Sequence, residues 1–225
     1  MLFDLAFVER AIPLILGAIP ITLLLTIMPM IVGTILGFLI ALTRNNRIPV
    51  LDPLASLFVS FIRGTPIFVL LFLFYYALPR VLGVGIKTIP ALATGLLTLS
   101  FVCTGYLSEI IRGALKSVDM YQMEAARSIG MTSVTAYRRI ILPQAIVVAM
   151  PNYFNFTANM LKNSSLVFGI GVIDIMAVAK VAAEGGYRYI ESYTIVAVLY
   201  VLFSLLFSAA FRYVEYVSRR RMGAL

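Results

Sequence analysis

The chain has 225 residues, of which 61% are hydrophobic and only 12% are charged, and its formal net charge is +8. A soluble domain carries about 25% charged residues, so this composition excludes an ordinary soluble protein and indicates a chain surrounded mainly by lipid. The basic residues flank apolar runs, which argues against nucleic acid as a partner, and the absence of His with a single Cys leaves no ordinary transition-metal site.

The first apolar stretch, residues 11–43, contains no charged residue. As one helix it would be longer than a bilayer core of about 30 Å. We expect Pro13, Pro20 and Pro29 to break or kink it, so the predicted first membrane span is about 16–42. No basic segment precedes this stretch, so we expect a retained span and not a cleaved signal peptide.

Four further spans follow in the chain. A spanning helix needs about 20 mostly apolar residues. Segments of that kind are found at about 54–79, 88–110, 140–161 and 191–213. The apolar segment 163–173 is too short to cross, so we expect it to be buried or to re-enter the membrane from the outside.

The distribution of Arg and Lys predicts the orientation. These residues are concentrated in the 43–52 loop, in the 109–139 segment and in the tail after residue 211. The positive-inside rule places these three regions in the cytoplasm. Five crossings then connect an outside N-terminus to a cytoplasmic C-terminus. The predicted fold class is an all-α membrane protein with one transmembrane domain over residues 1–225.

The cytoplasmic loop at about 117–139 has strong helix signals. Asp119 followed three residues later by Gln122 is typical of a capping box. Residues 121–128 favour a short helix, and Gly130 suits a left-handed residue that ends it.

A second helix is predicted directly after this turn. Thr132 or Ser133 can cap its start, and it continues into Pro143. The small side chains of Ala125 and Ala126 would let a partner approach the first helix closely. The result is a short helix, a sharp turn and another helix on the cytoplasmic face.

These residues also resemble the signature of a known family. Glu124-Ala125-Ala126, three residues, Gly130, nine residues and then Ile140-x-Leu142-Pro143 is similar to the signature of binding-protein-dependent ABC importer permeases. Three further segments resemble its polar amino acid uptake subfamily, which includes histidine, glutamine and cystine permeases: Arg63-Gly64-Thr65-Pro66, Glu109–Gly113 and Leu161–Leu166.

The resemblance implies a five-helix type I importer permease in a bacterial cell membrane. It implies a second permease subunit, identical or homologous, two cytoplasmic ATPase subunits and an extracytoplasmic solute-binding protein. In that family the loop helix docks on the ATPase and transmits its motion. Carried over, the ATPase-coupling residues are Glu124, Ala125, Ala126, Gly130 and Pro143.

The chain itself has no Gly-rich phosphate-binding loop. We therefore expect it to bind no cofactor and to be no enzyme, with ATP and Mg²⁺ held by the partner ATPase. The main alternative is an ion- or proton-coupled secondary amino acid transporter. That class needs acidic or His side chains deep in the spans, and the sequence predicts none there.

A polar stripe is predicted on the fourth span. Asn152, Asn155 and Asn159 share one face of a helix, and Lys162 follows at its end. They can line a solute path or make hydrogen bonds between helices, and we favour the path.

Arg63 lies within the second span, beside Gly64, Thr65 and Pro66. It can act as a gate or clamp at the cytoplasmic end, or simply extend its charge to the interface. We include Arg63 and Thr65 among the substrate-path residues.

The solute is expected to be a polar or neutral amino acid. The family usually has an acidic residue where this chain has Asn163, and some members that carry cationic amino acids have a carboxylate near the position of Phe156. Without such a carboxylate a cationic solute is disfavoured. The 48–50 and 71–79 segments are similar to those of members linked to sulfur amino acids such as cystine.

Overall fold

A computed structural model describes residues 3–119 and 121–221, and every regular element in these two ranges is helical. In chain order the helices are α1 (Leu5–Gly17), α2 (Ile19–Asn45), α3 (Leu51–Gly64), α4 (Ile67–Val81), η1 (Ile86–Thr88), α5 (Ala91–Ser117), α6 (Tyr121–Ser128), α7 (Ser133–Ala136), the π-helix η2 (Tyr137–Ile141), α8 (Leu142–Asn163), η3 (Ser164–Ile170), α9 (Ile175–Glu184) and α10 (Tyr189–Arg221).

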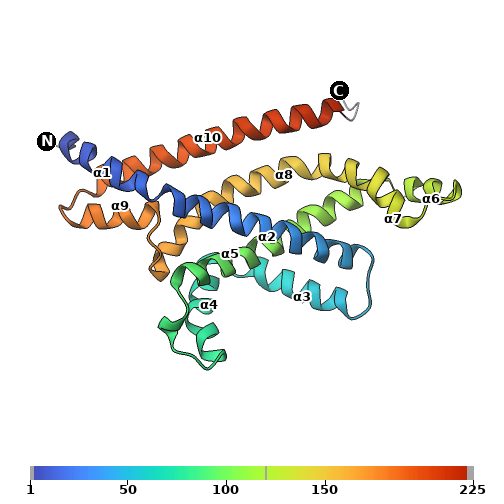
Figure 1. Cartoon of the computed structure of the whole chain (residues 1–225), viewed down its shortest axis with the longest axis horizontal. Helices are drawn as coiled ribbons and strands as arrows, with labels where there is room; N and C mark the ends of the chain where they lie inside the picture. Colours follow the sequence, from blue (N-terminus) through green and yellow to red (C-terminus); the bar gives the residue numbers. More distant parts are fainter. Residues whose placement is uncertain (1–2, 120, 222–225) are drawn as a thin grey trace.

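The long helices run roughly along one axis (Figure 1). Helix α5 packs against both α2 and α8, and α10 packs along α8. Helices α1 and α9 lie at one end with the start of α10, whereas α6, α7 and the α2–α3 loop lie at the other end. The two ends of the described chain therefore point toward opposite ends of the molecule, as an odd number of crossings would require.

The first apolar stretch forms two nearly continuous helices, and the predicted span 16–42 corresponds approximately to α2. The interruption falls at Ala18, between α1 and α2. Pro20 occupies the first turn of α2, where its missing N–H has no helical partner to lose. Pro13 and Pro29 lie inside helices, so of the three prolines only Pro20 adjoins the interruption.

The second predicted span, 54–79, is bent. Helices α3 and α4 meet at an angle of 111°. Thr65 is extended, with φ −107° and ψ 132°, because the ring of the following Pro66 excludes it from the helical region. The break falls directly after Arg63-Gly64, where Gly64 and Pro66 favour a local interruption of the helix.

Three stretches of the described residues are long and apolar enough to cross a membrane: Leu5–Asn45, Ala91–Ser117 and Tyr189–Val217. The bent pair α3–α4, and the helices of Ser133–Ile170 with α9, which meet at 53°, raise the number to five if each pair is one span. The helices run past the expected bounds: α5 starts after Pro90 and reaches Ser117, and α8 ends at Asn163.

The main core lies where α2 crosses α5. A methyl group added at Gly33 would overlap Cys103 Cβ and lie 2.8 Å from the Cys103 carbonyl carbon. One added at Gly37 would lie 3.0 Å from the backbone nitrogen of Ser108. These two glycines, four residues apart, let the two backbones approach as small residues do in membrane helix pairs.

A second core joins α1, α9 and α10 around Ile15, Ile175 and Ile195. It contains a buried acid, Asp174, whose carboxylate accepts a hydrogen bond from the Ala177 N–H and so caps α9. Its second oxygen has no hydrogen-bond partner among the described residues. Asp174 is therefore enclosed by the protein where α9 begins.

Candidate functional site

The turn after α6 has the conformation that its sequence predicts. Gly130 has φ +81°, its N–H donates to Arg127 O, and Met131 N–H donates to Ala126 O. Asp119 Oδ1 accepts a hydrogen bond from the Tyr121 N–H at 2.9 Å. The other half of the expected capping box is absent, because the Gln122 amide instead exchanges hydrogen bonds with the Gln144 amide on α8.

The second helix joins this turn to the membrane helices. Thr132 is its N-cap, and its hydroxyl accepts from the Thr135 N–H at 3.3 Å. The π-turn of η2 leads directly into α8, with Pro143 in the first turn of α8. The Tyr137 hydroxyl accepts from the Asn45 amide at 3.1 Å, which ties this segment to the end of α2.

Helix α6 exposes one side and buries the other. Ala126 is buried, whereas Glu124, Ala125 and Gly130 are exposed. Beside them lie three large apolar side chains that the sequence analysis did not single out, Tyr121 (69% exposed), Ile129 (78%) and Val134 (78%). Tyr121, Ala125 and Ile129 are spaced by four residues, so the signal for one apolar helix face was present. An exposed apolar face at the tip of the molecule is typical of a contact surface.

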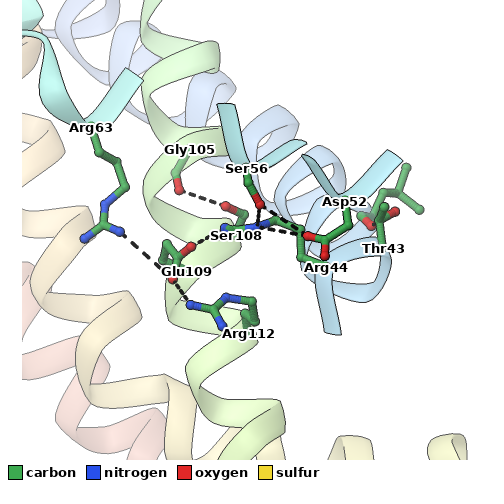
Figure 2. A network of polar contacts seen from close by, with 10 residues as sticks. Thr43, Arg44, Asp52, Ser56, Arg63, Gly105, Ser108, Glu109 and Arg112 are labelled. Atoms are coloured by element: carbon green, nitrogen blue, oxygen red, sulfur yellow. Dashed lines mark hydrogen bonds and ion pairs between the residues drawn. The ribbon is translucent and has the colours of Figure 1, made fainter. Parts of the chain in front are cut away.

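An ion network joins α2, α3 and α5 (Figure 2). Glu109 pairs with Arg112 one turn along α5, as expected, and also with Arg44 on α2, which the sequence did not predict. Arg44 Nε also donates to Ser56 Oγ on α3 at 2.9 Å, and Ser56 donates to Asp52 at 3.2 Å. The Arg44 and Glu109 side chains are only 15% and 17% exposed.

Arg63 stands at the edge of this network. Its guanidinium lies 4.0 Å from Glu109 Oε2 and 5.6 Å from the centre of the Tyr106 ring. Its side chain is 46% exposed and lines a cavity of about 440 Å³ together with Asn152. Arg63 therefore lines an open cavity between α3, α5 and α8, and almost half of its side chain is exposed.

The polar stripe of α8 faces away from its own bundle. Asn152, Asn155, Asn159 and Lys162 are exposed, whereas Thr157, Met160 and Leu161 on the other side of α8 are buried. Among the described residues the three Asn amides have no hydrogen-bond partner. Within the part of the chain that the structure describes, they therefore do not join helices by hydrogen bonds.

Comparison with known proteins decides the family. Residues 33–222 match the family described as binding-protein-dependent transport system inner membrane component. The chain is 44% identical over 205 residues to the "Probable amino-acid permease protein YxeN" of Bacillus subtilis, covering 91% of each chain. The chain belongs to this family. It is thus a multi-pass component of the membrane, and a transport protein.

Two more similar proteins have informative names. The permease is 36% identical over 216 residues to the L-cystine transport system permease protein TcyL of Bacillus subtilis, with 95% of this chain and 90% of TcyL covered. It also matches a chain of the crystal structure of an amino acid ABC transporter with histidines, with a TM-score of 0.86, 36% identity and coverage of 96% and 99%. The all-helical importer permease fold is thereby confirmed.

The predicted site residues of the permease fall into separate regions. Glu124, Ala125, Ala126 and Gly130 lie together on α6 and its turn, and Pro143 lies at the start of α8. Arg63 and Asn152 share the cavity, but Asn155, Asn159 and Lys162 do not line it. Thr65 donates its hydroxyl hydrogen bond to Phe61 O within its own helix turn. Glu109 and Gly113, which were not predicted as path residues, also line the cavity, together with Ile110, Ala114 and Val148.

The network predicts a stability effect for Glu109→Gln. Glutamine keeps the size of the side chain but removes the charge shared by Arg44 and Arg112. Leaving partly buried guanidinium groups without a counter-charge costs about 2 kcal/mol, so the melting temperature of the purified complex should fall by about 5 °C. Glu184→Gln is the matched control, because its pair with Lys180 is about half exposed and should contribute almost nothing. Equal melting temperatures for the two variants would contradict this role of Glu109.

Proposed function

We propose that the permease is the membrane subunit of an ATP-driven importer of a polar or neutral amino acid. Its partners are a pair of cytoplasmic ATPase subunits, a second permease subunit, identical or homologous, and an extracytoplasmic solute-binding protein. ATP and Mg²⁺ are held by the ATPase, and this chain binds no cofactor. It crosses the membrane five times, with its N-terminus outside and its C-terminus in the cytoplasm.

One observation carries this proposal: the exposed helix α6 at the tip of the molecule, closed by the left-handed turn at Gly130. We infer that the ATPase contacts Glu124 and Ala125 together with the exposed Tyr121, Ile129 and Val134. Because the Gln122 side chain is hydrogen-bonded to Gln144 on α8, a displacement of α6 would also move α8. As the two ATPase subunits close and open, the solute path would thus become accessible first from one side of the membrane and then from the other.

The solute class is supported by the similar proteins and by the charge of the path. The names of YxeN and TcyL refer to an amino acid and to L-cystine. Arg63 and Lys162 contribute positive charge, and the α8 stripe carries amides without a carboxylate. Such a path favours neutral solutes and disfavours cationic ones, with cystine as one candidate.

The test is uptake by the complete complex reconstituted in liposomes with its ATPase and binding protein. A panel of radiolabelled amino acids is offered with ATP, with ADP and with neither nucleotide inside the liposomes. We expect uptake of one amino acid or a small group only with ATP, and no effect of ionophores that collapse sodium or proton gradients. Liposomes with the ATPase but without the permease are the control.

The rival is an ion- or proton-coupled transporter, and the same experiment separates the two. Uptake that persists without ATP and disappears with an ionophore would favour the rival and refute the proposal. Binding of the same panel to the solute-binding protein identifies the solute independently. A cationic amino acid as the best ligand would contradict the solute class while leaving the ATP dependence intact.

A further inference from the structure

The cavity beside Arg63 lies among α3, α5 and α8. It has a volume of about 440 Å³, which is within the range of small-molecule sites. Its wall combines a few polar groups with apolar ones, from Arg63, Glu109, Ile110, Gly113, Val148 and Asn152. A free amino acid would therefore fit, with groups available for both its charged and its apolar parts.

The guanidinium of Arg63 is held in place but has unused donors. It lies over the Tyr106 ring, and Tyr106 in turn stacks on Phe156 with ring centres 5.3 Å apart. No described residue accepts a hydrogen bond from it, since its nearest acid, Glu109 Oε2, is 4.0 Å away. Arginine offers five N–H donors in a fork that matches a carboxylate.

Glu109 does not neutralise Arg63 alone, because its single negative charge is shared among three guanidinium groups. Oε1 pairs with Arg44 and Oε2 pairs with Arg112. The network contains three guanidinium groups, on Arg44, Arg63 and Arg112, against two carboxylates, on Asp52 and Glu109, which leaves one positive charge. Of the three arginines, Arg63 is the most exposed, so the surplus charge faces the cavity.

We propose that this cavity binds the carboxylate of the transported solute through Arg63, with the Asn152 amide, which also lines the cavity, as a second polar contact. This assignment rests on the proposed function and adds to it the group that is recognised. It explains how a path without a free acid can hold a zwitterion: the carboxylate is bound, and the side chain of the solute lies along the apolar wall. A phosphate headgroup of a lipid offers similar oxyanion chemistry and is separated from a solute by the test below.

The charge of the cavity can be measured with a cysteine placed in its wall. Gly113→Cys is suitable, because an added Cβ at Gly113 meets no atom within 4 Å and the single native cysteine, Cys103, is buried. The purified permease–ATPase complex in nanodiscs is treated with an anionic sulfonate-bearing or a cationic ammonium-bearing thiosulfonate reagent. Gly186→Cys, in the loop before α10, is the matched control in mixed-charge surroundings.

For each variant we measure the labelling rate with the anionic reagent divided by the rate with the cationic reagent. We expect this ratio to be about tenfold higher for Gly113→Cys than for Gly186→Cys. When Arg63→Gln is combined with Gly113→Cys, the preference for the anionic reagent should disappear. When Arg63→Lys is combined with Gly113→Cys, much of that preference should remain. Equal rates for the two reagents, no reaction with either, or a preference that survives Arg63→Gln would overturn the proposal.

The ligand is identified by testing which compounds protect the cysteine of Gly113→Cys from labelling. An equimolar mixture of neutral L-amino acids should slow the labelling of Gly113→Cys, and the same mixture as carboxamides should not. Equal protection by both mixtures, protection by neither, or a response only to anionic lipid in the nanodisc would overturn the solute assignment. If no amino acid is imported but the reagent preference stands, the proposed function fails and an anion site remains. If import occurs without the preference, only the present inference fails.

Discussion

Replacing Gly130 with valine is expected to abolish ATP-driven uptake while leaving the membrane helices folded. Gly130 has φ +81°, and a β-branched residue is strongly disfavoured there. An added Cβ meets no atom within 4 Å, so the effect would come from the backbone and not from a clash. The turn would re-form with another geometry, and α6 would present its exposed face in a wrong direction. We expect at least a tenfold loss of uptake and of permease-stimulated ATP hydrolysis.

Two control variants separate this effect from general strain. Gly83→Val meets the same backbone penalty, because Gly83 has φ +71° and open space, but it lies in the loop after α4. It should therefore reduce stability without uncoupling transport. Gly130→Asn should retain most uptake, since asparagine tolerates the left-handed conformation. Wild-type uptake in Gly130→Val, or an equal loss in Gly83→Val, would be incompatible with a coupling role for this turn.

Replacing Gly33 with valine is expected to prevent folding of the permease. The added side chain would overlap Cys103 Cβ and press on the α5 backbone, which cannot rotate away as a flexible side chain could. Overpacking of this kind costs about 1–3 kcal/mol or more, and α2–α5 is the most extensive helix contact in the chain. The measurement is the amount of monodisperse complex recovered by size-exclusion chromatography after solubilisation.

A milder variant and a matched control keep this prediction testable. Gly33→Ala should fold but melt about 5 °C lower, because the α2–α5 backbones must separate slightly. Gly17→Val places the same side chain near the end of α1, where an added Cβ meets no atom within 4 Å, and should be recovered at wild-type levels. Normal recovery of Gly33→Val would show that α2 and α5 are not packed as described.

The helices and the turn at Gly130 were predictable for different reasons. Apolar length is a property of each segment alone, so four of the five expected spans coincide approximately with α2, α5, α8 and α10. The Gly130 turn and the Thr132 cap depend on residues within a few positions of each other, and both were predicted. The π-turn at Tyr137–Ile141 was not predicted, and we have no local sequence signal that explains it.

The sequence predicted only some of the residues that form the cavity and its ion network. Arg63 and Asn152 were selected because a charge or an amide is unusual inside an apolar segment. Glu109 was expected to pair with Arg112 three residues away, a local rule. Its second partner, Arg44, is 65 residues distant, and no periodicity connects the two positions.

The sequence by itself determined that the permease is helical, that it lies in lipid, and where its helices and the turn at Gly130 occur, because these depend on hydrophobicity and on contacts within one or two helix turns. Only the tertiary structure decided the close contact at Gly33 and Gly37, and the grouping of Arg44, Arg63 and Arg112 around one glutamate. Each of these depends on which helices become neighbours, and that choice is made by packing between segments far apart in the chain.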